Sequence, residues 1–191
     1  MLGGSDFVFL DVHKNKENLK ELLEVMGEGQ KIWGQTLVEA GADILMVSGP
    51  TSSGDAVSPR VWEEFGAPYF AEVVAYLKKI GVKVFSHICG DTNDRLKSIS
   101  SLGQDCLSVD QKVDLAYVRK ILGPKRCIMG NIDPTNLLLF GSPEEVSRQS
   151  VKVIEQAGKE GAFVLSGGCL ILDAPPENMR AMVKAASGHE Y

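Results

Sequence analysis

The stretch "VKVFSHICGDTNDRLKSISSLGQDCLSVD", residues 82–110, decides the fold class. It begins with an apolar run at 82–89, continues through a polar turn and a helical pattern at 94–103, and ends in a second apolar run at 105–110. Two short strands separated by a helix of this length predict a βαβ unit, in which the strands lie parallel.

The same alternation extends in both directions along the chain. Further strands are expected at 43–49, 126–133 and 162–169, with helical patterns at 58–81, 114–123 and 142–158. Ser142, followed by Pro143 and then Glu145, is typical of a capping box at a helix start. The sequence therefore predicts an α/β domain of about five parallel strands with flanking helices. Residues 1–191 are expected to form one such domain.

Composition excludes several classes of function. The net charge is −5, and the basic residues are scattered rather than gathered in a stripe, so nucleic acid is not an expected partner. No apolar stretch approaches the roughly 18 residues of a membrane span, and the N-terminus does not read as a signal peptide. A cytoplasmic protein without membrane contact is expected, and four widely spaced cysteines favour metal binding, catalysis or burial over disulfides.

Polar and reactive residues gather where the expected strands end. In parallel α/β folds this edge of the sheet carries the active site. The residues that share this position and are candidates for function are His87, Cys89, Asp110, Asn131, Asp133 and Cys169.

His87 and Cys89 are two residues apart on one strand, so their side chains point to the same face. A catalytic zinc ion typically has three protein ligands and one open position, and Cys169 would be the third ligand. Asp110 is the candidate for an oxygen ligand that a substrate displaces. The alternative for His87 and Cys89 is that both are ordinary core residues at a strand end.

The remaining candidates have two interpretations each. Asn131 and Asp133 are either a functional pair or turn residues before Pro134, and the sequence does not choose between the two. Cys106 and Cys127 lie earlier in their strands among apolar neighbours and are expected in the core.

Several segments resemble the uroporphyrinogen decarboxylase superfamily, whose members are (β/α)8 barrels. The resemblance covers about residues 40–186 and is carried, in the family's order, by "GADILMVSGPTSSGDAVSPRVWEEFGAPYF", "VFSHICGD", "MGNIDPTNLL", "GSPEEV" and "VLSGGCLILDAPPENMRAMVKA". It implies that the five strands are the fourth to the eighth of a TIM-type barrel and that the N-terminal strands are missing from this chain.

Within the superfamily, His-x-Cys with a distant Cys resembles the zinc-dependent methyltransferases that move a methyl group between a corrinoid protein and a thiol such as coenzyme M. The resemblance implies zinc on His87, Cys89 and Cys169, and a corrinoid carried by a separate protein. Decarboxylases of the family have a Gly-His-Gly near the position of "GGC" at 167–169, so Cys169 favours the methyltransferases. A uroporphyrinogen decarboxylase-like activity is the alternative.

A partial barrel has two open strand edges and an exposed apolar interior, which invite pairing with another chain. A homo-oligomer or a complementary N-terminal chain is therefore expected. A non-catalytic half-barrel, kept as a remnant or a subunit, is the third interpretation of this sequence.

Overall fold

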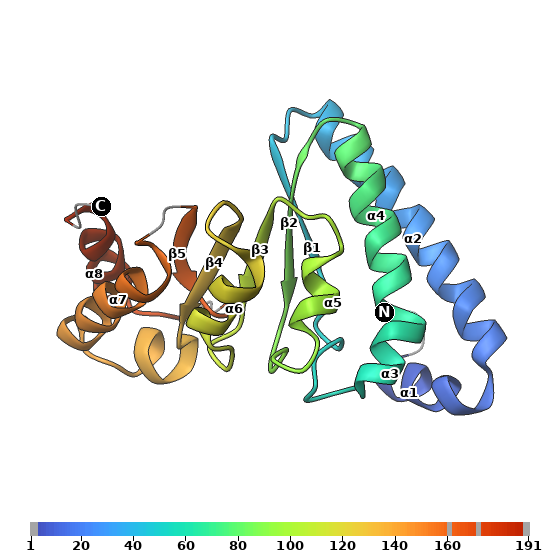
Figure 1. Ribbon diagram of the computed structural model, residues 1–191, viewed down its shortest axis with the longest axis horizontal. Coiled ribbons are helices and arrows are strands. Elements are labelled where there is room, and N and C mark those ends of the chain that lie inside the picture. Colours follow the sequence, from blue (N-terminus) through green and yellow to red (C-terminus); the bar gives the residue numbers. More distant parts are fainter. Residues whose placement is uncertain (1–3, 160–161, 171–172, 189–191) are drawn as a thin grey trace.

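Five parallel strands form one sheet in a computed structural model that describes residues 4–159, 162–170 and 173–188. The strands lie side by side in chain order, β1-β2-β3-β4-β5, as Figure 1 shows. Their bounds are β1 Ile44–Ser48, β2 Lys83–Ile88, β3 Cys106–Val109, β4 Cys127–Ile132 and β5 Phe163–Gly167. Each falls inside an expected strand, and the predicted α/β class with five parallel strands is confirmed.

Helices connect and flank the strands. The longest, α2, runs beside α4 at one end of the sheet, and α7 packs against α8 at the other (Figure 1). Their bounds are α1 Gly4–Lys14, α2 Lys16–Glu39, α3 Pro59–Val61, α4 Ala67–Lys79, α5 Leu96–Ser100, α6 Leu115–Leu122, α7 Pro143–Ala157 and α8 Pro176–Ser187. Two π-helical turns, η1 Trp62–Gly66 and η2 Pro134–Leu139, precede α4 and follow β4.

The two faces of the sheet differ in burial. Ile88, Val109 and Ile128 point to the helices and belong to the main core. Their neighbours in sequence point to the other face, where Met46 of the edge strand β1 is 47% exposed and Val164 of the edge strand β5 is 38% exposed. The sheet therefore has one face covered by helices and one face that is partly open.

The expected helix at 58–81 is interrupted rather than continuous. Pro68 lacks the backbone N–H that would continue the helical hydrogen bonds, and the chain forms the π-helical turn η1 just before α4. Gly66 lies directly against the Trp62 ring, since a Cβ built there would come 2.3 Å from Trp62 Cε3. The capping box predicted at Ser142 is present, with both of its hydrogen bonds formed.

Within the described residues, β1 and β5 each pair with a single strand, so the sheet has two free edges. The sheet is thus the five-stranded part of a TIM-type barrel rather than a closed one. No helix in the described ranges is long and apolar enough to cross a membrane.

Candidate metal centre

Three potential ligands meet at the carboxyl end of the sheet. His87 lies in β2, Cys89 follows the end of that strand, and Cys169 follows β5. The Cys89 Sγ atom lies 3.3 Å from His87 Nε2 and 3.6 Å from Cys169 Sγ. Residues 80 positions apart in the sequence therefore share one site, and their ligand atoms all lie within 4.8 Å of one another.

The donor set and its spacing fit zinc. A tetrahedral zinc ion with ordinary bond lengths separates two sulfur ligands by about 3.8 Å, and a sulfur from a nitrogen by about 3.6 Å. The two distances from the Cys89 sulfur are close to these values, and the His87 and Cys169 ligand atoms lie within 4.8 Å of each other. His87 is buried and the two cysteines are partly buried, so a fourth position can remain accessible to a substrate.

The protonation of the site is also suited to a cation. Burial lowers the pKa of the His87 imidazole below its ordinary value, which favours the neutral form that binds metals. Burial and the neighbouring Cys169 sulfur raise the pKa of Cys89 to about 11, so this thiol keeps its proton at neutral pH when no cation is nearby. A bound divalent cation would reverse this effect and favour the thiolate.

Asp110 lies beside the three ligands but is not one of the group that they form. Its Oδ2 accepts a hydrogen bond from the backbone N–H of Gly90 at 2.8 Å, and its Oδ1 accepts one from the N–H of Lys112 at 3.1 Å. Both carboxylate oxygens therefore accept hydrogen bonds from backbone N–H groups in loops that border the site.

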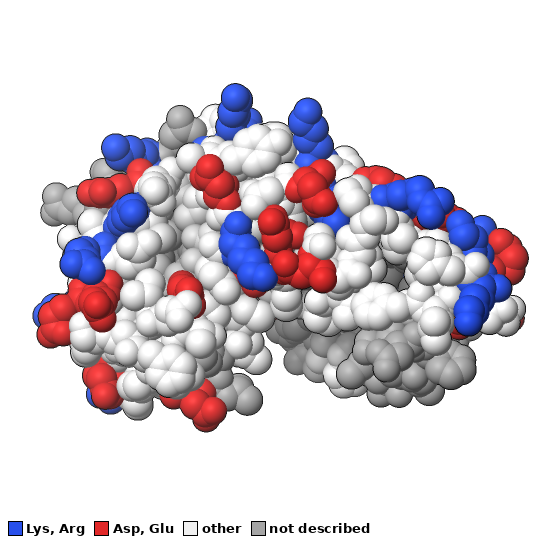
Figure 2. Space-filling model, turned by 90° about the horizontal axis from the view of Figure 1, so that it is seen from below, with Lys and Arg blue, Asp and Glu red and all other residues white. Residues whose placement is uncertain are grey.

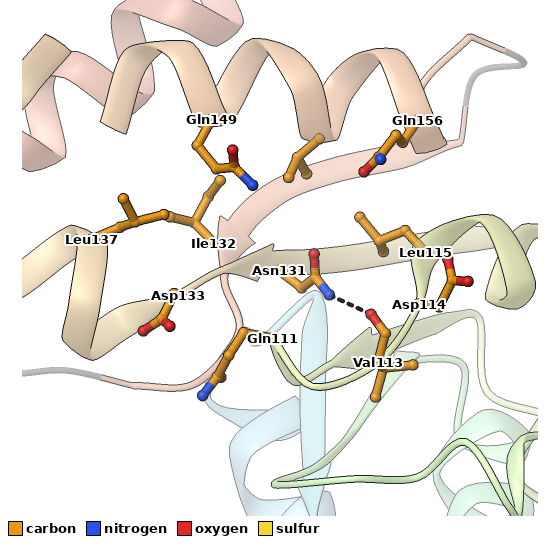
Figure 3. A pocket seen from close by; sticks show the side chains of 11 residues that line it. Gln111, Val113, Asp114, Leu115, Asn131, Ile132, Asp133, Leu137, Gln149 and Gln156 are labelled. Carbon is orange, nitrogen blue, oxygen red and sulfur yellow. Dashed lines mark hydrogen bonds between the residues drawn. The ribbon is translucent and has the colours of Figure 1, made fainter. Parts of the chain in front are cut away.

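Asn131 and Asp133 line a different hollow, of about 360 Å³, between the ends of β3 and β4 and helix α7. The amide nitrogen of Asn131 donates to the carbonyl oxygens of Asp110 and Val113. The side chains of Gln149 and Gln156 extend from α7 into the same hollow (Figure 3). The Asp133 carboxylate accepts hydrogen bonds from Thr135 and Asn136 and caps η2. The structural role of these two residues is therefore clear, and their catalytic role stays a prediction.

The two other cysteines lie away from the site. Cys106 and Cys127 face each other across β3 and β4, and neither belongs to the ligand group. Cys106 is buried as expected for a core residue, whereas Cys127 is only partly buried.

Sequence reasoning did not single out Ser108 or Gly168, which both touch the site. The Ser108 hydroxyl lies 3.1 Å from His87 Nδ1. Gly168 packs so closely against Gln111 that a Cβ on it would lie 2.4 Å from the Gln111 backbone nitrogen. The signal that could have found Ser108 is its position two residues before Asp110 on the same strand face.

Charged side chains give no sign of a polyanion-binding surface on the face drawn in Figure 2. Lysine and arginine side chains alternate there with aspartate and glutamate side chains and form no continuous stripe.

Comparison with known proteins places the chain in a family. Residues 3–189 match the family model described as uroporphyrinogen decarboxylase (URO-D), and the chain belongs to that family. A solved structure, a methyltransferase from Methanosarcina mazei, superposes with a TM-score of 0.86 at 26% identity, covering 94% of this chain and 52% of that one.

The curated relatives include methyltransferases and decarboxylases. The Methylcobamide:CoM methyltransferase MtbA of Methanosarcina acetivorans is 30% identical over 97% of this chain and 54% of its own length. The uroporphyrinogen decarboxylase of Chlorobium phaeovibrioides is 35% identical over 77% of this chain and 42% of its own length. The chain thus spans about half the length of the curated relatives that it matches.

Proposed function

We propose that this chain is a zinc-dependent methyltransferase, or the zinc-bearing C-terminal part of one, that transfers a methyl group between a corrinoid protein and a thiol. The observation that carries the proposal is the group formed by His87, Cys89 and Cys169, whose ligand atoms lie within 4.8 Å of one another. The methyltransferases among the relatives support the choice of reaction.

The chemistry of the site suits a thiol substrate. Two cysteine thiolates and one neutral histidine would balance the charge of Zn²⁺, and the ion would favour loss of the proton from an incoming thiol. The sulfur then forms the new bond to the methyl carbon. The bond from that carbon to cobalt breaks with its electron pair left on the corrinoid, and the thiol proton passes to solvent.

The residues around the ligands have supporting roles in this proposal. His87 stays neutral because it is buried, and the partly buried sulfurs leave one side of the site open. Asp110 is the sequence-based candidate for a displaceable fourth ligand, and the cobalt(II) spectrum of Asp110→Asn, described below, distinguishes that role from a positioning role. Asn131 and Asp133 remain the candidates for catalysis.

The proposed partners are based on the methyltransferase relatives, which are named as methylcobamide:CoM methyltransferases. The corrinoid would be carried by a separate protein, and the acceptor would be a small thiol. The free strand edges of the described sheet would pair with a further copy of this chain or with a complementary N-terminal chain. We place the protein in the cytoplasm and treat residues 1–191 as a single domain.

The test of the proposed function is methyl transfer from free methylcobalamin to coenzyme M, followed by the change in the visible spectrum of the corrinoid. We expect turnover by the zinc-loaded parent chain and at least a tenfold loss in Cys169→Ser, because the substitution removes a zinc ligand. Cys127→Ser, a matched change outside the ligand group, should keep the parent rate.

Transfer that is equal in the parent and in Cys169→Ser would overturn the proposal. A parent that binds zinc but transfers no methyl group would favour the non-catalytic half-barrel instead.

The second candidate is decarboxylation of a porphyrinogen, which the decarboxylases among the relatives favour. It predicts loss of carbon dioxide from uroporphyrinogen with no dependence on zinc, measured by chromatography of the oxidised products. Decarboxylases of the family have a histidine near the position that Cys169 occupies in this chain. Cys169 therefore favours the methyltransferase.

A further inference from the structure

Two polar residues, Ser108 in β3 and Asp110 just after its end, lie beside the candidate ligands. Ser108 is the register partner of His87 across β2 and β3, and Asp110 follows two residues later on the same face. Ser108 is 4% exposed and Asp110 is 5% exposed. Buried polar side chains at such a place need hydrogen-bond partners, and those partners are the ligand residues and the chain beside them.

Ser108 contacts the side of the His87 ring that faces away from the sulfurs. Its hydroxyl lies 3.1 Å from Nδ1, while Nε2 lies 3.3 Å from Cys89 Sγ. When Nε2 presents its lone pair to a metal, Nδ1 carries the proton and donates it to the Ser108 oxygen. The hydroxyl can accept from the protonated Nδ1 of the tautomer that metal binding requires, and the contact holds the ring in the orientation that turns Nε2 toward the sulfurs.

Asp110 acts on the other ligand through the backbone. Gly90, which follows Cys89, has φ +87, a conformation that side chains rarely adopt, and its N–H donates to Asp110 Oδ2. The second oxygen, Oδ1, holds the N–H of Lys112. The carboxylate thus fixes the turn that directs the Cys89 sulfur toward His87 and Cys169.

We propose that Ser108 and Asp110 are positioning residues of the metal centre, with Ser108 orienting His87 and Asp110 orienting Cys89. The inference rests on the proposed zinc site. It gives Asp110 a role that its contacts support, in place of direct ligation, and it gives Ser108 a role that neither the family match nor the sequence motifs assign.

The first test measures zinc affinity by competition with a chromogenic chelator. Ser108→Ala should bind zinc about 10- to 100-fold more weakly than the parent. Ser108→Thr, which keeps the hydroxyl, should restore most of that loss. The matched control is Ser86→Ala, because Ser86 is buried next to His87 on the opposite face and its hydroxyl has no hydrogen-bond partner among the described residues.

The second test asks which atoms bind the metal. Cobalt(II) replaces zinc, and its visible absorption bands report the number and type of ligands. We expect Asp110→Asn to weaken binding while leaving the band positions of the parent, because the ligand set is unchanged. A shift of the bands on this substitution would show that Asp110 is itself a ligand and would overturn its positioning role.

Thermal unfolding of the metal-free proteins checks that each variant folds. If Asp110→Asn does not fold, Ser108→Ala against Ser86→Ala still decides the inference, since equal zinc affinity in these two variants would refute it. A parent chain that binds neither zinc nor cobalt would instead refute the proposed function, so the two failures are distinguishable.

Discussion

At the scale of single residues, the position of Cys169 depends on the glycine before it. A Cβ on Gly168 would lie 2.4 Å from the Gln111 backbone nitrogen and 2.9 Å from its side-chain oxygen. Backbone cannot move aside as a flexible side chain can, so any larger residue at 168 must shift the turn that carries the third ligand.

We therefore expect Gly168→Ala to lower the free energy of unfolding by about 1–3 kcal/mol and to weaken zinc binding. Gly29→Ala is the control, because no atom lies within 4 Å of a Cβ at this position in α2. Replacing a helical glycine by alanine should stabilise the chain by about 0.5–1 kcal/mol. Denaturant unfolding and chelator competition measure both effects, and parent-like values for Gly168→Ala would contradict the packing described.

The grouping of His87, Cys89 and Cys169 could be predicted from the sequence, and the contacts of the residues around this group could not. His87 and Cys89 are two residues apart at the end of an apolar run, and Cys169 ends another such run, so strand geometry alone brings them to one edge. The contact of Ser108 with His87 depends on the register between β2 and β3. Register arises from packing of the whole sheet, which no local pattern specifies.

At the scale of elements, helix α7 begins at a complete capping box. The Ser142 hydroxyl accepts a hydrogen bond from the N–H of Glu145, and the Glu145 carboxylate accepts one from the N–H of Ser142. The box fixes the start of a helix that packs against β4, β5 and α8. Removing the capping box should therefore lower the stability of the whole domain.

We expect Ser142→Ala to lower the free energy of unfolding by about 1 kcal/mol. Ser147→Ala, in the same helix beyond the first turn, should cause no loss, because alanine has the higher helix propensity. Urea unfolding of the three proteins measures the difference. A Ser142→Ala variant as stable as Ser147→Ala would show that the cap contributes nothing.

The same box predicts a dependence on pH. Hydrogen bonds from the Ser142 backbone and side chain hold the pKa of Glu145 below its ordinary value of 4.5. A folded-state pKa below the unfolded one adds stability that is present above pH 4.5 and is lost as the pH falls through the folded value.

The Tm difference between the parent and Glu145→Ala should therefore be largest at neutral pH and should shrink in acid. A difference that stays constant from neutral pH down to pH values below the carboxyl pKa would contradict this contribution.

Elements were predictable where a local pattern repeats and less so where two signals compete. All five strands lie within their expected ranges because apolar, β-branched runs alternate with helical patterns. The segment 58–81 carries a helical pattern throughout, yet Pro68 interrupts its hydrogen bonds and the chain forms η1 before α4. The periodicity of this segment correctly predicts helical structure, but it wrongly predicts one continuous helix.

At the scale of the whole molecule, the dominant feature is the partly open face of the sheet, which carries Met46 and Val164 and is called the inner face here. Ile44 and Met46 on β1 are 52% and 47% exposed, and β1 has a free edge. In α2, which precedes β1, Val25, Ile32 and Trp33 are also exposed. Apolar surface beside an unpaired strand edge favours association with another chain.

We expect the isolated chain to self-associate, and Met46→Lys to shift it toward the monomer, because a charge on the inner face of β1 disfavours burial there. Tyr117→Lys, at a partly exposed position of α6, is the control and should leave the assembly unchanged. Sedimentation velocity measures the mass. A parent chain that is monomeric and melts as an ordinary stable domain would count against association.

The most direct test of the account is the zinc content of the parent chain, measured by elemental analysis on protein purified without a chelator or a polyhistidine tag. We predict about one zinc per chain in the parent and in Cys127→Ser, and none in the His87→Ala, Cys169→Ser double variant. No zinc in the parent, even after incubation with the metal, would mean that His87, Cys89 and Cys169 are neighbours in a fold without a metal centre.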